Sequence, residues 1–172
     1  LWIGTGNGLN RWDRDTGSFD RYFYDPSNPN SLVGSDVRDV LEDSQGRLWV
    51  ATTNGLDLLD RETGTFTHFR HDPNDPSTLP GNRLLDLLEG SRGNLWVASR
   101  GDPSGSGGLG RLDLEAPGEG FERYRHDPND PTSLAIDRVR VLYEDDQNRL
   151  WVGTENGGLD RLDRDTGTFH HN

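Results

Sequence analysis

The stretch VRDVLEDSQGRLWVATTNGLDLLDRETGTFTHFRHDPNDPSTLPGN, residues 37–82, is the fullest copy of a unit that recurs along the chain. A Leu-Trp pair marks each copy, at residues 1–2, 48–49, 95–96 and 150–151, so the tryptophans are 47, 47 and 55 residues apart. A fixed period of this length indicates one supersecondary unit repeated in series. The fold of the chain is therefore the fold of this unit, repeated.

Each copy contains four short runs with the chemistry of β-strands. In the fullest copy these runs are residues 37–42, 48–52, 56–59 and 66–70, and turns rich in Gly, Asn and Asp separate them. No segment places apolar residues at helical spacing over three turns. The pattern predicts an all-β chain with four antiparallel strands in each copy.

Four-stranded units of about 40–50 residues are typical of the blades of a β-propeller. We expect blades at residues 1–36, 37–83, 84–138 and 139–172, of which the first lacks its inner strand. An open propeller leaves an apolar face and unpaired strand edges. We therefore expect residues 1–172 to form one partial propeller, which is either part of a larger protein or completed by association of copies.

The tryptophans that mark the repeat lie on the second strand of each predicted blade. A large aromatic side chain on this strand can pack between neighbouring blades, and burial is the usual environment of tryptophan. We predict that all four belong to the core: Trp2, Trp49, Trp96 and Trp151.

The repeat resembles the two-component regulator propeller family. The resemblance rests on LWIGT, LWVAT and LWVGT at residues 1–5, 48–52 and 150–154, and on Asp-Pro steps at residues 25–26, 72–73 and 127–128. Ser-Leu and Glu-Asp pairs recur between these motifs, whereas Gly90 stands where other copies have Asp and Asn148 where they have the turn Gly. The resemblance implies the extracytoplasmic sensing region of a bacterial hybrid two-component sensor kinase, located in the periplasm or outside the cell.

The composition narrows the range of partners. The net charge is −12, and all 18 basic residues are Arg. A chain this acidic is a poor candidate for binding nucleic acid or an anionic membrane surface. The sequence has no Cys, no apolar run that approaches a membrane span and no signal peptide.

We expect function at one mouth of the propeller, where the long Asp-Pro connectors meet the loops between second and third strands. Arg presents a planar fork that suits carboxylates and sugar hydroxyls, so a polar site for a saccharide or another small solute is predicted there. The alternative for each residue is a salt bridge between adjacent blades. The candidates are Asp36, Arg38, Asn54, Asn82, Arg83, Arg100, Asp102, Asp137, Arg138, Arg140, Glu155 and Asn156.

One loop breaks the repeat. The third copy expands the loop between its second and third strands to SRGDPSGSGG, residues 99–108. Insertions into single repeats map to loops and often to the binding face, so we expect this loop to contribute to recognition. The alternative is a neutral insertion, since Gly-Ser sequences tolerate changes in length.

Catalytic, metal and cofactor sites are not predicted. His71 and His126 occupy equivalent positions in their repeats, which favours a structural role, and no Ser-His-Asp order or HExxH motif occurs. Asp-rich turns such as residues 13–15 and 163–165 lack the spaced oxygen ligands of a calcium loop. We predict a non-enzymatic binding or sensing propeller; the alternatives are a propeller-type polysaccharide lyase or hydrolase and a protein-interaction scaffold.

Overall fold

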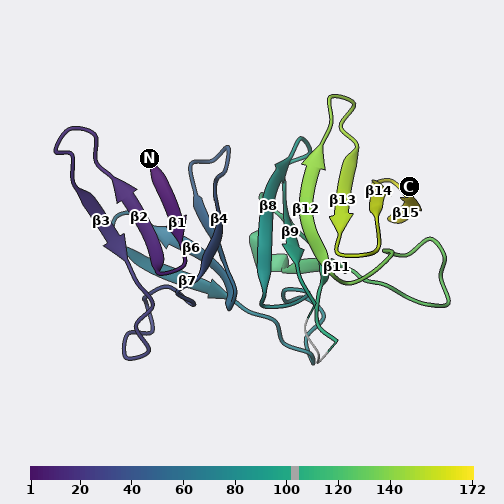
Figure 1. Ribbon diagram of the computed structural model, residues 1–172, viewed down its shortest axis with the longest axis horizontal. Helices are drawn as coiled ribbons and strands as arrows, with labels where there is room; N and C mark the ends of the chain where they lie inside the picture. Colours follow the sequence, from purple (N-terminus) through teal and green to yellow (C-terminus); the bar gives the residue numbers. More distant parts are fainter. Residues whose placement is uncertain (102–104) are drawn as a thin grey trace.

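The computed structural model describes residues 1–101 and 105–172, and in these residues the strands form four antiparallel sheets in chain order (Figure 1). The first sheet has three strands, β1 (Trp2–Thr5), β2 (Gly8–Trp12) and β3 (Phe19–Tyr22). The second contains β4 (Val37–Glu42), β5 (Leu48–Thr52), β6 (Gly55–Asp60) and β7 (Thr65–Phe69). The third contains β8 (Leu84–Gly90), β9 (Asn94–Ser99), β10 (Gly108–Asp113) and β11 (Phe121–Tyr124). The fourth contains β12 (Val139–Glu144), β13 (Leu150–Thr154), β14 (Leu159–Asp163) and β15 (Thr168–His171).

This architecture confirms the predicted all-β fold and the three-stranded first sheet. Neighbouring strands in each sheet are consecutive in the chain, so every sheet is a meander of antiparallel strands. The only helix in the described ranges is the short 3₁₀ segment η1 (Pro117–Glu119). No helix in that part of the chain has the length and apolar character needed to cross a bilayer.

The turn after each first strand depends on a left-handed residue. Gly46 has φ 76° between β4 and β5, a conformation that costs glycine little. Asn148 takes the same place between β12 and β13 with φ 59°, and Asn is among the few other residues that tolerate it. The departure from the repeat at this turn therefore leaves the hairpin intact.

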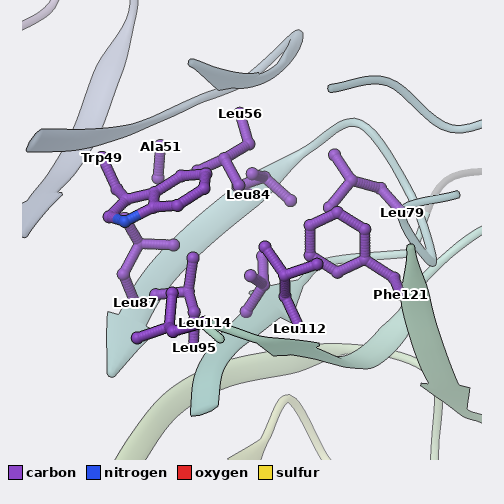
Figure 2. Packing of buried hydrophobic residues seen from close by; sticks show 11 residues of the cluster. Trp49, Ala51, Leu56, Leu79, Leu84, Leu87, Leu95, Leu112, Leu114 and Phe121 are labelled. Carbon is purple, nitrogen blue, oxygen red and sulfur yellow. The ribbon is translucent and has the colours of Figure 1, made fainter. Parts of the chain in front are cut away.

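The hydrophobic core lies between the sheets. Three clusters of buried side chains fill the boundaries between successive sheets, and Figure 2 shows the one between the second and third. Trp49 and Trp96 are buried, as predicted, and each packs near an aromatic residue of its own sheet. The prediction was wrong in degree for Trp2 and Trp151, which are only half-buried because they lie in the two outer sheets.

Carboxylates join the first strands of the sheets to one another. Asp39 on β4 accepts a hydrogen bond from the backbone N–H of Leu87 on β8 (2.8 Å), and Asp86 on β8 accepts one from Leu142 on β12 (2.6 Å). Each of these first strands has a register irregularity just before this position. The strands predicted to be innermost therefore lie beside one another and are linked along their length.

The long connectors are bound to the sheets by a second set of buried carboxylates. Asp57 on β6 accepts the N–H of Val33 (2.8 Å) and contacts Nδ1 of His68 (2.6 Å), whose Nε2 lies 2.8 Å from the carbonyl of Pro29. The fourth sheet repeats this arrangement: Asp160 accepts the N–H of Ala135, and His171 links Asp160 to the carbonyl of Pro131.

The third sheet holds its connector with different residues. Pro80 stands where Val33 and Ala135 stand in the other connectors, and proline has no N–H to donate. Gly110 takes the place of the carboxylate, and a Cβ added there would lie 3.0 Å from Cδ of Pro80. Arg123 replaces the histidine and donates to the carbonyls of Thr78 (2.6 Å) and Asp75 (2.6 Å).

Candidate functional site at the connector ends of the third and fourth sheets

Five of the predicted site residues meet where the third and fourth sheets approach each other on the connector side. We call them the connector-face cluster: Arg83, Arg100, Arg138, Arg140 and Glu155. Backbone hydrogen bonds hold the cluster together, from the N–H of Arg100 to the carbonyl of Arg83 (2.9 Å) and from the N–H of Glu155 to the carbonyl of Arg138 (2.8 Å). Arg100 also forms an isolated antiparallel bridge with Arg138.

Glu155 is the acidic centre of this cluster. Its Oε1 accepts a hydrogen bond from Nη2 of Arg100 (2.9 Å), and its Oε2 lies 2.6 Å from Nε of the same guanidinium as an ion pair. Nη1 of Arg140 lies 3.8 Å from the same carboxylate. Arg83, Arg138 and Arg140 remain exposed, so their guanidinium groups are available to a solute.

Other predicted residues lie elsewhere on the connector side. Asp36 and Arg38 form their own ion pair (2.5 Å) at the start of β4. Asn54 is exposed and lines a separate hollow of about 250 Å³ against the first connector. Asn156 is exposed in the β13–β14 loop, where its φ is 72°. The structure does not bring these residues into the connector-face cluster.

Two predicted residues hold the connectors in place. Oδ1 of Asn82 accepts the N–H of His71 (2.7 Å), and Oδ1 of Asp137 accepts the N–H of His126 (2.7 Å). These equivalent bonds close the two connectors on themselves, which is a structural task. Asp102, the remaining predicted residue, lies outside the described residues.

The insertion in the third sheet packs against the preceding connector. The N–H of Gly107 donates to the carbonyl of Pro80 (2.8 Å), and Ser106 is buried. A Cβ added to Gly107 would approach the carbonyl oxygen of Asp137 at 2.4 Å, so only glycine fits there. Gly107, at the described end of this loop, thus lies between the connectors that lead to Arg83 and to Arg138.

The carboxylates that act between elements were not among the predicted site residues. Burial, with the nearby Asp39 carboxylate as a further cause, raises the pKa of Asp86 to about 6. Burial likewise raises the pKa of Asp57 to about 6. The recurrence of Asp at these places in the repeat was the available signal. Within the described ranges, no group of three or more His, Asp or Glu side chains is placed to hold a metal ion.

The Asp-rich turns are occupied by local hydrogen bonds. Oδ1 of Asp163 accepts the N–H groups of Asp165 (3.0 Å) and Thr166 (3.2 Å), and Asp13 does the same in the first sheet. These bonds lower the pKa of both carboxylates. Their chemistry is that of turn formation.

Comparisons with known proteins relate this architecture to a family. The model of the two-component regulator propeller matches residues 31–54, 78–101 and 133–156. Each match runs from the end of a connector through the first two strands to the loop beyond them, which includes much of the connector-face cluster. No curated protein sequence matches the chain.

Solved structures share the architecture of this chain. The chain is 31% identical to the extracellular domain of the hybrid two-component system BT3049 from B. thetaiotaomicron, with a TM-score of 0.75, and the match covers 98% of this chain and 21% of that one. The extracellular domain of BT4673 from the same organism shares the fold at 22% identity and a TM-score of 0.77, covering 99% and 23%. PorZ, a surface component of the type-IX secretion system of Porphyromonas gingivalis, shares it at 17% identity and a TM-score of 0.65, covering 94% and 23%. The chain thus spans about a fifth of the length of these proteins, and its three matched segments are similar to the repeat of the two-component regulator propeller family.

Proposed function

We propose that the chain is a non-enzymatic, extracytoplasmic sensing segment that binds a saccharide or another small polar solute at the connector-face cluster. Similarity to the family's repeat supports the sensing role, and the extracellular domains that the chain resembles support the location. The observation that carries the binding site is the pairing of Arg100 and Arg140 with Glu155 at the boundary of two sheets, with Arg83 and Arg138 joined to this pair through the backbone.

The geometry of the cluster suits a polar solute. The paired Arg100 and Glu155 form a fixed floor, since each restrains the other, while the exposed guanidinium groups can donate to hydroxyl or carboxylate oxygens. A solute that spans the third and fourth sheets would favour one relative placement of these sheets. Such a difference in affinity between two placements is what a sensor requires.

The test is calorimetric titration of the chain with neutral and uronate-containing oligosaccharides. We expect at least one to bind, and we expect Arg100→Gln and Glu155→Gln to weaken this binding roughly tenfold each, as for the loss of a charge-assisted hydrogen bond. Arg61→Gln is the matched control, because Arg61 pairs with Glu42 at the opposite ends of the strands. Chromatography of the recovered oligosaccharide should show it unchanged.

Two results would overturn the proposal. One is binding that Arg100→Gln and Glu155→Gln leave as strong as in the parent chain. The other is the appearance of shortened or unsaturated products, which would identify an enzyme.

A further inference from the structure

The boundary between the third and fourth sheets differs from the boundary before it on the hairpin side, opposite the connectors. Between the second and third sheets, Trp49 is surrounded by residues that balance in charge and pack tightly: Asp43, Gln45, Arg47, Leu58, Phe69 and Leu114. The equivalent residues around Trp96, between the third and fourth sheets, are Gly90, Arg92, Asn94, Arg111, Tyr124 and Arg164.

Compared with the surroundings of Trp49, those of Trp96 lack a carboxylate and contain more arginines. Asp43 accepts the indole N–H of Trp49 (2.8 Å) and Nε of Arg47 (2.6 Å), and Asp145 binds Trp151 in the same way. At Trp96 this carboxylate is replaced by Gly90. Three arginines therefore gather around a tryptophan whose own sheet supplies no acid to it.

Arg164 is the central cation. Its side chain is only 6% exposed and lies over the ring of Trp96, 5.7 Å from the ring centre. Nη2 donates to Glu144, whereas among the described residues neither Nε nor Nη1 has a hydrogen-bond partner, and the buried Nε1 of Trp96 has none either. Buried donors of this kind are costly unless something accepts from them.

These residues enclose a space. A cavity of about 50 Å³ is lined by Arg92, Asn94, Trp96, Arg111, Tyr124 and Arg164. Next to it lies an open hollow of about 240 Å³, which shares Arg92 and Arg164 and adds Arg149 and Arg161. The two linings together contain five arginines and one carboxylate, Asp163. Such a balance is unusual for a chain of net charge −12.

The nearby acids do not neutralise the cavity from within. Asp165 pairs with Arg92 at 3.0 Å and Glu122 with Arg111 at 2.8 Å, and neither acid lines the space. Glu144 accepts from Nη2 of Arg164 and from the N–H of Ser91 (3.1 Å), and its Oε2 lies 2.9 Å from the place that a Cβ on Gly90 would take, outside the lining of the cavity. Each arginine therefore keeps further N–H groups for a ligand, because a guanidinium has five.

We propose that this cavity and the adjoining hollow bind the oxyanion group, a carboxylate or a sulfate, of a small acidic solute. The anion accepts from Nε and Nη1 of Arg164, beside the ring of Trp96. Arg92 and Arg164 contact it from both spaces, and the hollow receives the rest of the solute. This site lies at the opposite ends of the strands from the connector-face cluster. A test that disproves one of the two sites therefore leaves the other unaffected.

The test follows the five indole N–H signals of the ¹⁵N-labelled chain by NMR, with Trp96 assigned from Trp96→Phe. Sodium sulfate and sodium glucuronate are titrated separately at constant ionic strength, with glucose as the neutral control. We expect a saturable shift of the Trp96 signal with one or both anions, no shift with glucose, and no shift of Trp151, whose N–H is already bound to Asp145. Response to sulfate alone indicates an inorganic ligand; response to glucuronate indicates a sugar acid.

Two variants sharpen the result. Arg92→Gln changes an exposed arginine and should weaken anion binding roughly tenfold, whereas Arg61→Gln at the boundary of the first and second sheets should not. The proposal is overturned if the Trp96 signal does not move, if all five signals move together, or if Arg92→Gln and Arg61→Gln behave alike.

Discussion

Single residues in this chain are best understood against their counterparts in the other repeats. The pair Asp57 and Val33 in one sheet corresponds to Gly110 and Pro80 in the next, so the acceptor is absent where the donor is absent. A buried carboxylate without an N–H partner would carry a large desolvation cost. The two exchanges are therefore physically linked, although the partners are 24 residues apart in one sheet and 30 in the other.

The tryptophan positions differ in what their loss would cost. We expect Trp96→Ala to lower the free energy of unfolding by about 3–5 kcal/mol, as for truncation of a fully buried aromatic side chain. Trp151→Ala should cost less than half as much, because Trp151 is half-buried. Denaturant titration of both variants measures the difference, and equal losses would contradict the assignment of Trp96 to the core.

The buried carboxylate Asp86 makes stability depend on pH. Its pKa is raised to about 6 from an ordinary value of 3.8, so the folded chain holds the proton more tightly than the unfolded chain. The stabilising contribution is present below about pH 4 and is lost as the pH rises through 6. Asp86→Asn can still accept the N–H of Leu142, and it should remove this dependence.

The expected outcome is a gain by Asp86→Asn of roughly 1–2 kcal/mol relative to the parent chain between pH 4 and pH 7. Urea unfolding at both pH values measures this gain. Asp137→Asn is the control, because the Asp137 carboxylate binds the N–H of His126 and does not join two first strands. A parallel pH dependence in Asp86→Asn and the parent chain would count against it.

Elements are joined here by side chains that reach from one element to the backbone of another. Asp39 and Asp86 bind the N–H groups of the next first strand, and Asp57 and Asp160 bind those of the preceding connector. In the described residues the strand ladders run within single sheets, and the bridge between Arg100 and Arg138 joins the third sheet to the fourth. The order of the sheets therefore depends on these carboxylates together with the apolar clusters between the sheets.

A double-mutant cycle on one connector tests this arrangement. Asp57→Gly should cost about 2–3 kcal/mol, because it leaves the buried N–H of Val33 without an acceptor. Val33→Pro should also destabilise the chain, because it leaves Asp57 without its donor. The double variant reproduces the pairing of Pro80 with Gly110, so its cost should fall at least 1 kcal/mol short of the sum. Simple additivity in thermal unfolding would contradict this account of the connector.

At the scale of the whole molecule, the two outer sheets present faces that are covered in the inner sheets. Val141 and Tyr143 on β12 are 55% and 63% exposed. The residues that correspond to Tyr143 in the two inner sheets are Leu41 and Leu88, and both pack against the clusters between sheets. Phe19 and Phe23 are similarly exposed in the first sheet region. Apolar faces of this kind favour association.

We therefore expect the chain to self-associate, with a mass that rises with concentration. Tyr143→Glu should lower the mass at a given concentration, because a charge on that face opposes its burial. Light scattering after size exclusion measures both, and Glu119→Gln on the exposed η1 segment is the control. A parent chain that remains a monomer throughout the concentration range would refute the expectation.

The sequence by itself determined the repeat, the all-β class and the placement of the strands, because strand alternation and turn residues act over a few neighbours at a time. It also identified Arg100, Glu155, Arg138 and Arg140 as candidates, since loop positions in a repeat map to one end of the strands. Only the tertiary structure decided which of these candidates meet, which ones fasten connectors, and that Trp2 and Trp151 are half-buried. It alone revealed the cavity at Trp96, because that cavity arises where Asn94 and Arg111 on one sheet face Arg164 on the next. Contacts between sheets join residues some 50 to 70 positions apart, and no local pattern reports such pairs.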